Sequence, residues 1–113
     1  MENKYLNEVT KLLGHVHPRL IARDRITFKD VFGAVAGYGN GHIFITCGKF
    51  GIALRLPRDV LDQLFKEKGV KHLKYFPNGH IKKEYAVLPK RILEDRLRLG
   101  LLFKKSIEYV LLP

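Results

Sequence analysis

The sequence predicts an α+β protein in two layers, with an antiparallel sheet packed under helices in the order α-β(3)-α-β(2)-α. Three observations lead to this fold class. Glycines and an Asn-Gly pair separate short apolar runs within residues 32–56. In the last of those runs, large apolar residues occupy every second position. Segments with helical spacing lie before, between and after the strand candidates. This arrangement is typical of an antiparallel meander covered by helices.

The length and composition suit one domain covering residues 1–113. A chain of 113 residues, 46% of them apolar, has enough material for one core and too little for a second. No apolar run approaches the roughly 20 residues that cross a bilayer, and no secretory leader opens the chain. We therefore expect a cytoplasmic protein without membrane contact. The single cysteine, Cys47, excludes an intramolecular disulfide.

Residues 3–13 are predicted as the first helix because their apolar residues recur at spacings of three and four. These residues are Tyr5, Leu6, Val9, Leu12 and Leu13. Asn3 has the side chain of a helix N-cap, and Gly14 suits the position after a helix end. A linker around Pro18 follows.

Residues 26–56 contain the next strand candidates, and we expect about three strands before the middle helix. β-Branched and aromatic residues favour a strand within residues 26–32. Residues 35–38 and 42–47 flank Asn40-Gly41, a pair that supplies the positive φ angles of a tight hairpin turn. Residues 50–56 alternate and have one apolar face, which is typical of a half-buried strand.

The second half of the chain predicts a helix, a hairpin and a final helix. Pro57 suits the first turn of a helix whose apolar stripe ends before Gly69. Residues 73–76 and 81–87 flank a Pro-Asn-Gly turn, so we expect them to pair as two strands. One continuous helix is expected from Lys90 to about Leu111, with ion pairs four residues apart along it.

The final helix has more apolar residues than one buried stripe requires. They are Ile92, Leu93, Leu97, Leu99, Leu101, Leu102, Phe103, Ile107, Val110, Leu111 and Leu112. In one interpretation the helix lies in a deep groove between the sheet and the first helix. In the other, part of its surface is a site of self-association, because large exposed apolar patches usually mark interfaces.

No catalytic, cofactor-binding or metal-binding residue is predicted. His15 and His17 lie two residues apart, but no cysteine pair or carboxylate completes a metal site, so we interpret the histidines as structural or surface residues. Cys47 ends an apolar strand candidate and is expected to be an inert thiol. Ser106 is the sole serine and lies mid-helix, which argues against a hydrolytic triad.

The glycines between Gly33 and Gly41 allow a phosphate-loop interpretation, because glycines let backbone amides approach an anion. Neither nucleotide-binding fingerprint is present and no helix follows directly. Turn and bulge glycines are the favoured interpretation.

The chain is strongly basic, with 21 Lys and Arg residues against 11 Asp and Glu and a formal net charge of +10. Such an excess attracts polyanions, and it also keeps small proteins soluble. The nucleic-acid-binding candidates are Lys71, Lys74, Lys82, Lys83, Lys90 and Arg91. Phosphate contact without base readout is the expected mode, and a solvated surface is the alternative.

One ordered set of residues runs through positions 31–95. Its members are Val31-Phe32-Gly33, Tyr38, Asn40-Gly41, Ile43-Phe44, Tyr75, Gly79, Lys83, Tyr85, Leu88-Pro89 and Leu93-Glu94-Asp95. This order resembles the TfoX N-terminal domain family over residues 26–110. The chain departs from the family at residues 33–36, where it has Gly-Ala-Val-Ala and the family commonly has Gly-Gly-Tyr-Gly.

The resemblance implies a fold similar to that of secretion chaperones and a role near the transcriptional regulation of DNA uptake, alongside a partner activator. It implies no catalytic residue, because the family has none established. We therefore expect a non-enzymatic regulatory or adaptor domain that acts through protein–protein contacts, as a homodimer formed through the last helix or a sheet edge. The alternative is sequence-independent nucleic-acid binding by the basic surface.

Overall fold

The computed structural model describes residues 4–16, 26–31, 33–74 and 78–111. Within these ranges the chain forms four helices and six strands. In chain order they are α1 (Lys4–Val16), β1 (Ile26–Val31), β2 (Ala34–Gly39), β3 (His42–Gly48), β4 (Gly51–Arg55), α3 (Arg58–Leu64), β5 (Lys71–Leu73), β6 (Lys82–Val87), α4 (Lys90–Leu93) and α5 (Arg96–Leu111).

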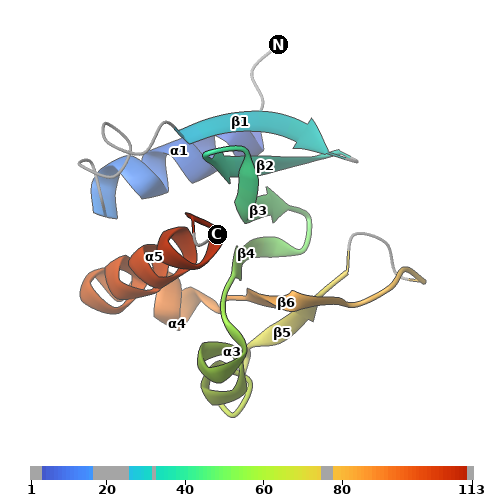
Figure 1. Ribbon diagram of the computed structural model, residues 1–113, viewed down its shortest axis with the longest axis vertical. Coiled ribbons are helices and arrows are strands. Elements are labelled where there is room, and N and C mark those ends of the chain that lie inside the picture. The colour runs from blue at the N-terminus through green and yellow to red at the C-terminus, as the bar shows by residue number, and fades with distance from the viewer. Residues whose placement is uncertain (1–3, 17–25, 32, 75–77, 112–113) are drawn as a thin grey trace.

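All six strands belong to one sheet in the order β1-β2-β3-β4-β6-β5, and every neighbouring pair is antiparallel. The first four strands form a meander. The chain then passes through α3 to the edge strand β5 and returns as β6, which pairs with β4 (Figure 1). The predicted α+β class with an antiparallel sheet is therefore confirmed.

The turn between β2 and β3 has the conformation that the sequence predicts. Asn40 has φ 52° and Gly41 has φ 85°, so both central residues of the two-residue loop are left-handed. This combination matches the right-handed twist of the flanking strands. Residues 33–41 thus form strand and turn, which confirms the turn interpretation of these glycines and excludes a helix-capped phosphate loop at this position.

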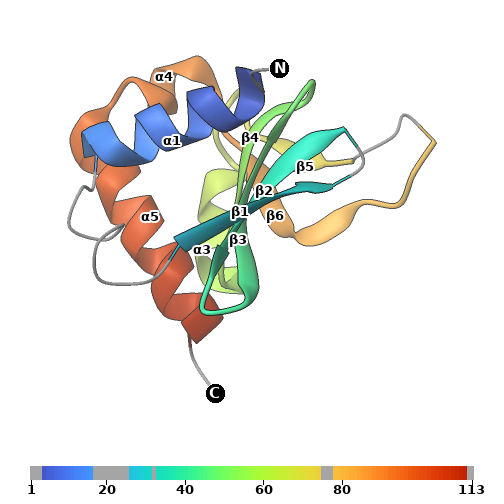
Figure 2. The ribbon, with the colours of Figure 1, turned by 90° about the horizontal axis from the view of Figure 1, so that it is seen from above.

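The helices pack on one face of the sheet and form the main core with it. Val9 and Leu13 of α1 and Phe103 of α5 are fully buried and join Ile45 and Leu54 of the sheet in one cluster. Figure 2 shows α1, α4 and α5 together on one side of the strands. A second, smaller cluster of Ala53, Leu73 and Val87 is separate from the helical cluster, because these side chains belong to the opposite face of the sheet.

Ser106 attaches α5 to the sheet. This fully buried side chain lies 3.0 Å from the carbonyl oxygen of Phe44 and 2.6 Å from that of Arg55, within hydrogen-bond distance of both. The hydroxyl of a mid-helix serine thus contacts carbonyl groups of both β3 and β4, and its single proton is donated to one of them at a time. It also fixes the position of α5 along the strands.

Two predictions about element number are wrong. Four strands precede α3 instead of about three, because residues 26–31 pair along their whole length with β2 and complete the meander. The predicted continuous helix from Lys90 to about Leu111 is broken into α4 and α5. Asp95 causes this break, since its carboxylate accepts the backbone N–H of Arg98 at 3.2 Å, as an N-cap does for a new helix.

Several boundaries also differ from those predicted. The first helix continues past Gly14 to Val16, and α3 ends at Leu64, before the left-handed Gly69 with φ 90°. The strand expected at 73–76 is observed as β5, Lys71–Leu73, because it pairs with β6 over these residues. The expected Asn3 cap, the linker around Pro18 and residues 75–77 of the last hairpin lie outside the described residues.

None of the described helices combines the length and the apolar character that crossing a membrane requires.

Gly37 and Gly39 of β2 form a matched pair for testing core packing. A Cβ at Gly37 would lie 2.6 Å from a methyl group of Ile45 and 3.1 Å from the ring of Phe28, whereas a Cβ at Gly39 would meet nothing closer than 3.7 Å. We expect Gly37→Ala to lower the free energy of unfolding by about 1–3 kcal/mol through overpacking. Gly39→Ala should change it by less than about 1 kcal/mol. Urea unfolding measures both, and equal effects would contradict the packing.

Candidate functional site

The outer side of α5 carries an exposed apolar ridge, which we define as Leu97 and Leu101. The side chains are four residues apart and therefore on one face of the helix, and the residues are 84% and 60% exposed. Leu111 in the last turn is also exposed, at 39%. The remaining described apolar residues of α5 pack inward, so most of the helix is buried against the sheet. The ridge is left uncovered, and self-association through it stays a prediction.

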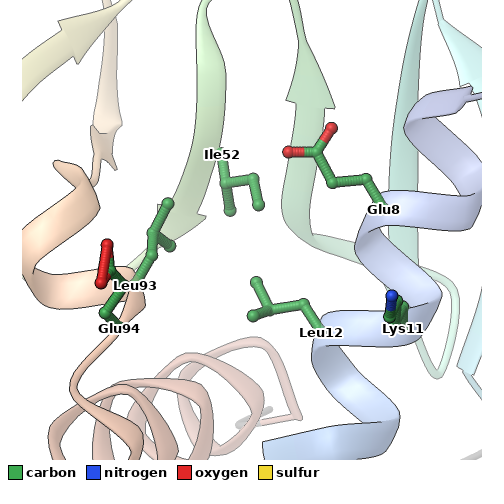
Figure 3. A pocket seen from close by; sticks show the side chains of 6 residues that line it. All are labelled: Glu8, Lys11, Leu12, Ile52, Leu93 and Glu94. Carbon is green, nitrogen blue, oxygen red and sulfur yellow. The ribbon is translucent and has the colours of Figure 1, made fainter.

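Residues of α1, β4 and the end of α4 line an open pocket of about 430 Å³. Its lining residues are Glu8, Lys11, Leu12, Ile52, Leu93 and Glu94. Figure 3 shows the apolar side chains of Leu12, Ile52 and Leu93 around one space, with the carboxylates of Glu8 and Glu94 on opposite sides of it. The pocket thus has apolar walls and an acidic border in which Lys11 supplies one positive charge.

Cys47 is a buried free thiol next to a residue that lines this pocket. It is buried in β3 as the cross-strand partner of Ile52. Burial raises the pKa of its thiol from 9.0 to about 12, and the negative charge of Glu8 and a hydrogen bond to Glu8 add to the effect. The expected burial of the thiol is confirmed, its inertness stays a prediction, and Glu8 is the polar group that contacts it.

A charged network holds α4 and α5 against the turn after α3. The guanidinium of Arg98 donates two hydrogen bonds to the carboxylate of Glu67, and a nitrogen of Arg91 lies 3.7 Å from the same carboxylate. Arg91 also donates to the carbonyl of Lys68 at 2.8 Å. The hydrogen bonding from Arg98 is the main cause that lowers the pKa of Glu67. These arginines therefore stabilise the packing of the helical layer. They pair with Glu67 in place of the expected partners four residues away along one helix.

The structure separates the six basic candidates into two groups. Lys71, Lys74, Lys82 and Lys83 are exposed and belong to the β5–β6 hairpin region. Lys90 and Arg91 are on α4, where Lys90 lies 3.7 Å from Glu94 and Arg91 contacts Glu67. Charges already paired within the protein have less to gain from a phosphate. None of the ion pairs in the described part of the chain involves Lys71, Lys74 or Lys83, so these three are the stronger part of the predicted surface.

The described histidines do not gather into a metal site. His42 begins β3, His80 precedes β6, and His72 of β5 stacks on the ring of Phe65 at 4.1 Å between centroids. No cluster of three or more His, Cys, Asp or Glu residues suitable for a metal occurs among the residues that the structure describes. His17 and the side chain of His15 lie outside them, so the interpretation of that pair stays a prediction.

A second polar cluster joins α5 to β4 and β6. The guanidinium of Arg55 lies 3.1 Å from a carboxylate oxygen of Glu84, and the hydroxyl of Tyr109 donates to the other oxygen. The hydrogen bond to Glu84 is the main cause that raises the pKa of Tyr109. The cluster anchors the second half of α5, and its contacts are again structural.

No known family model matches the chain, and a search of curated proteins finds no significantly similar sequence. The resemblance to the TfoX N-terminal domain family therefore stays a prediction.

The sequence pattern indicates the excess of apolar residues in the final helix, but it does not locate the pocket or the ridge. The pocket joins α1, β4 and α4, which are far apart in the sequence, so no local pattern indicates it. A local signal for the ridge did exist. The buried residues Leu99, Phe103 and Ser106 recur at helical spacing, and Leu97 and Leu101 lie on the opposite side of that stripe.

The thiol of Cys47 provides a test of its contact with Glu8. With a pKa of about 12, its alkylation rate in the folded protein should still rise with pH beyond 9, because the thiolate fraction keeps growing up to the folded-state pKa. Glu8→Gln removes the charge that disfavours the thiolate, so it should speed alkylation at pH 8, whereas Glu108→Gln on the exposed side of α5 should not. Iodoacetamide labelling followed by mass spectrometry measures both rates. Equal rates in the two variants would contradict the contact between Glu8 and Cys47.

Proposed function

We propose that this protein is a non-enzymatic regulatory or adaptor domain of the cytoplasm that acts through protein–protein contacts, as the resemblance to the TfoX N-terminal domain family implies. The observation that carries the proposal is the exposed ridge of Leu97 and Leu101 on α5. Two leucines of this exposure on one helix face form an apolar surface that a partner protein can bury.

The distribution of shifted pKa values supports a binding function over a catalytic one. Titratable groups tuned for catalysis usually gather in one cleft. Here the described groups with shifted pKa values are spread over the fold, and each is explained by a structural contact. Glu67 pairs with Arg98, Tyr109 bonds to Glu84, and Cys47 is shielded by burial.

If the protein is an adaptor, substitutions on the ridge should abolish the binding of its partner proteins. We expect the double variant Leu97→Glu/Leu101→Glu to lose proteins that the wild-type chain retains from a native lysate, because two carboxylates at the centre of an apolar contact must be desolvated. Ile81→Glu is the matched control, since Ile81 is an exposed apolar residue, at 43%, that precedes β6 and does not belong to α5. Circular dichroism verifies folding. If the double variant retains the same set of proteins as the wild-type chain, the proposal is contradicted.

A second candidate function, sequence-independent nucleic-acid binding, is favoured by the exposed lysines of the β5–β6 hairpin. None of the ion pairs found in the described part of the chain involves Lys71, Lys74 or Lys83. Together with Lys82, they bring four positive charges to one hairpin of a chain with net charge +10. Neutralising phosphates releases condensed counterions, and this gain requires no base contact.

Nucleic-acid binding should show a steep dependence on salt that is attributable to the hairpin. We expect labelled duplex or single-stranded DNA to bind at low salt, and Lys82→Ala/Lys83→Ala to reduce the slope of log affinity against log salt by about 2. Lys104→Ala/Lys105→Ala removes the same charge from exposed positions of α5 and should leave the slope nearly unchanged. Fluorescence anisotropy at two salt concentrations measures this. Absence of binding at low salt, or equal effects of the two variants, would eliminate the hairpin as a nucleic-acid site.

A further inference from the structure

We infer that the second face of the sheet, opposite the main cluster, binds single-stranded nucleic acid. Bases stack on the rings of Tyr38, Phe50 and Tyr85, and phosphates contact Lys29 and Lys71. The inference rests on the second candidate function, because both require binding of nucleic acid. It adds the surface that receives the bases and a preference for unpaired strands.

One row of cross-strand partners crosses all six strands on the second face. Its members, taken from one edge of the sheet to the other, are Lys29, Ala36, Thr46, Ala53, Val87 and Lys71. Side chains of directly opposed residues share a face of the sheet. Ala53 and Val87 belong to the smaller cluster, so the whole row lies on the side of that cluster. The row begins and ends with an exposed lysine.

The helices of the described residues belong to the other side of the sheet. Each of α1, α3, α4 and α5 places buried side chains in the main cluster. Figure 2 shows α1, α4 and α5 together on one side of the strands. The smaller cluster instead consists of residues from β4, β5 and β6, with Phe50 and Tyr85 packed against it. Aromatic rings thus lie over this part of the second face.

Three aromatic side chains of the second face are partly exposed. Phe50 and Tyr85 pack against the smaller cluster and keep part of their surface in contact with solvent. Tyr38 lies two residues beyond Ala36 along β2 and therefore on the same face. The ammonium of Lys29 lies 5.3 Å from the centroid of the Tyr38 ring. A ring beside a cation offers a base both a stacking surface and a phosphate contact.

The charges that the strands place on the second face are positive. The described strands contain two acidic residues, Asp30 and Glu84, and both belong to the helical side. Asp30 is the cross-strand partner of Val35, a member of the main cluster, and Glu84 accepts a hydrogen bond from α5. A phosphate next to Lys29 or Lys71 therefore meets no carboxylate from a strand of the same face.

This combination favours a single strand over a duplex. Bases of a duplex are stacked on one another, whereas each base of a single strand can stack on an aromatic side chain. Neighbouring strands lie about 4.8 Å apart, so the row from Lys29 to Lys71 extends over roughly 24 Å of the sheet. That distance corresponds to about seven stacked nucleotides at about 3.4 Å each.

Fluorescence anisotropy of the full chain tests the inference. The probe is a labelled thymidine oligomer of about 12 nucleotides, a length within the range of single-strand-binding domains. We expect it to bind at least about tenfold more tightly at low salt than a duplex of the same length. Stacking and phosphate contacts do not read the 2′-hydroxyl, so the uridine oligomer should bind within about threefold of the DNA strand.

Two matched tyrosines test the stacking. Tyr38→Leu should raise the dissociation constant for the single strand at least about fivefold, the loss of one stacked base, while Tyr38→Phe keeps the ring and the affinity. Tyr5→Leu is the control, because Lys4 lies 5.2 Å from the Tyr5 ring but Tyr5 packs against the main cluster. Thermal unfolding verifies that each variant is folded.

The lysines at the ends of the row are tested by salt dependence. Lys29→Ala/Lys71→Ala should reduce the slope of log affinity against log salt by about 1.4, since each phosphate contact on a single strand contributes about 0.7. Lys104→Ala/Lys105→Ala removes the same charge from α5 and should leave the slope nearly unchanged.

The outcomes separate this inference from both proposed functions. A duplex that binds as tightly as the single strand overturns it, and so does Tyr38→Leu with no larger effect than Tyr5→Leu. A difference above about tenfold between the DNA and RNA strands overturns the stacking mode as well. If Lys82→Ala/Lys83→Ala still lowers the salt slope in such a case, the second candidate function holds through phosphate contact alone. Absence of binding by every strand at low salt overturns both, while the adaptor function is tested separately by the proteins retained through the ridge.

Discussion

The packing of α5 across β3 and β4 is the constraint on which the rest of the structure depends. Phe103 of α5 is fully buried against the sheet, and the hydroxyl of Ser106 lies within hydrogen-bond distance of a carbonyl oxygen in each of the two strands. An antiparallel sheet with an uncovered apolar face is unstable in water, so one face must be sealed by helices. The inward side of α5 is committed to that task, and its outer side is left for contacts with other molecules.

The break between α4 and α5 links this packing to the candidate site. Because Asp95 starts a new helix, α4 closes one side of the pocket while α5 runs along the sheet. Glu67 then receives Arg91 from α4 and Arg98 from α5, and so holds the two helices in their relative positions. A single acidic residue at the start of a helix thus separates the element that lines the pocket from the helix that carries the ridge.

The positive charge of the protein is used in two different ways. Arg55, Arg91 and Arg98 bind carboxylates of other elements and stabilise the fold. The lysines of the β5–β6 hairpin and of α5 are exposed, and there the compact ammonium group can stay hydrated. The division follows the chemistry of the side chains, since the planar guanidinium can donate paired hydrogen bonds to a carboxylate and the ammonium cannot.

The sequence by itself determined the class of fold and the turns. Asn40 and Gly41 take the left-handed conformations that their residue types favour, and the helical spacing in α1 predicts the burial of Val9 and Leu13. Local backbone and side-chain preferences are enough for such features. The half-buried character expected of β4 is wrong, because Ala53 on its other face is fully buried as well. The register of β5, the pairing of Arg98 with Glu67, and the pocket were decided only by the tertiary structure. Each depends on segments distant in the chain, and such contacts form only when the shared core brings the segments together.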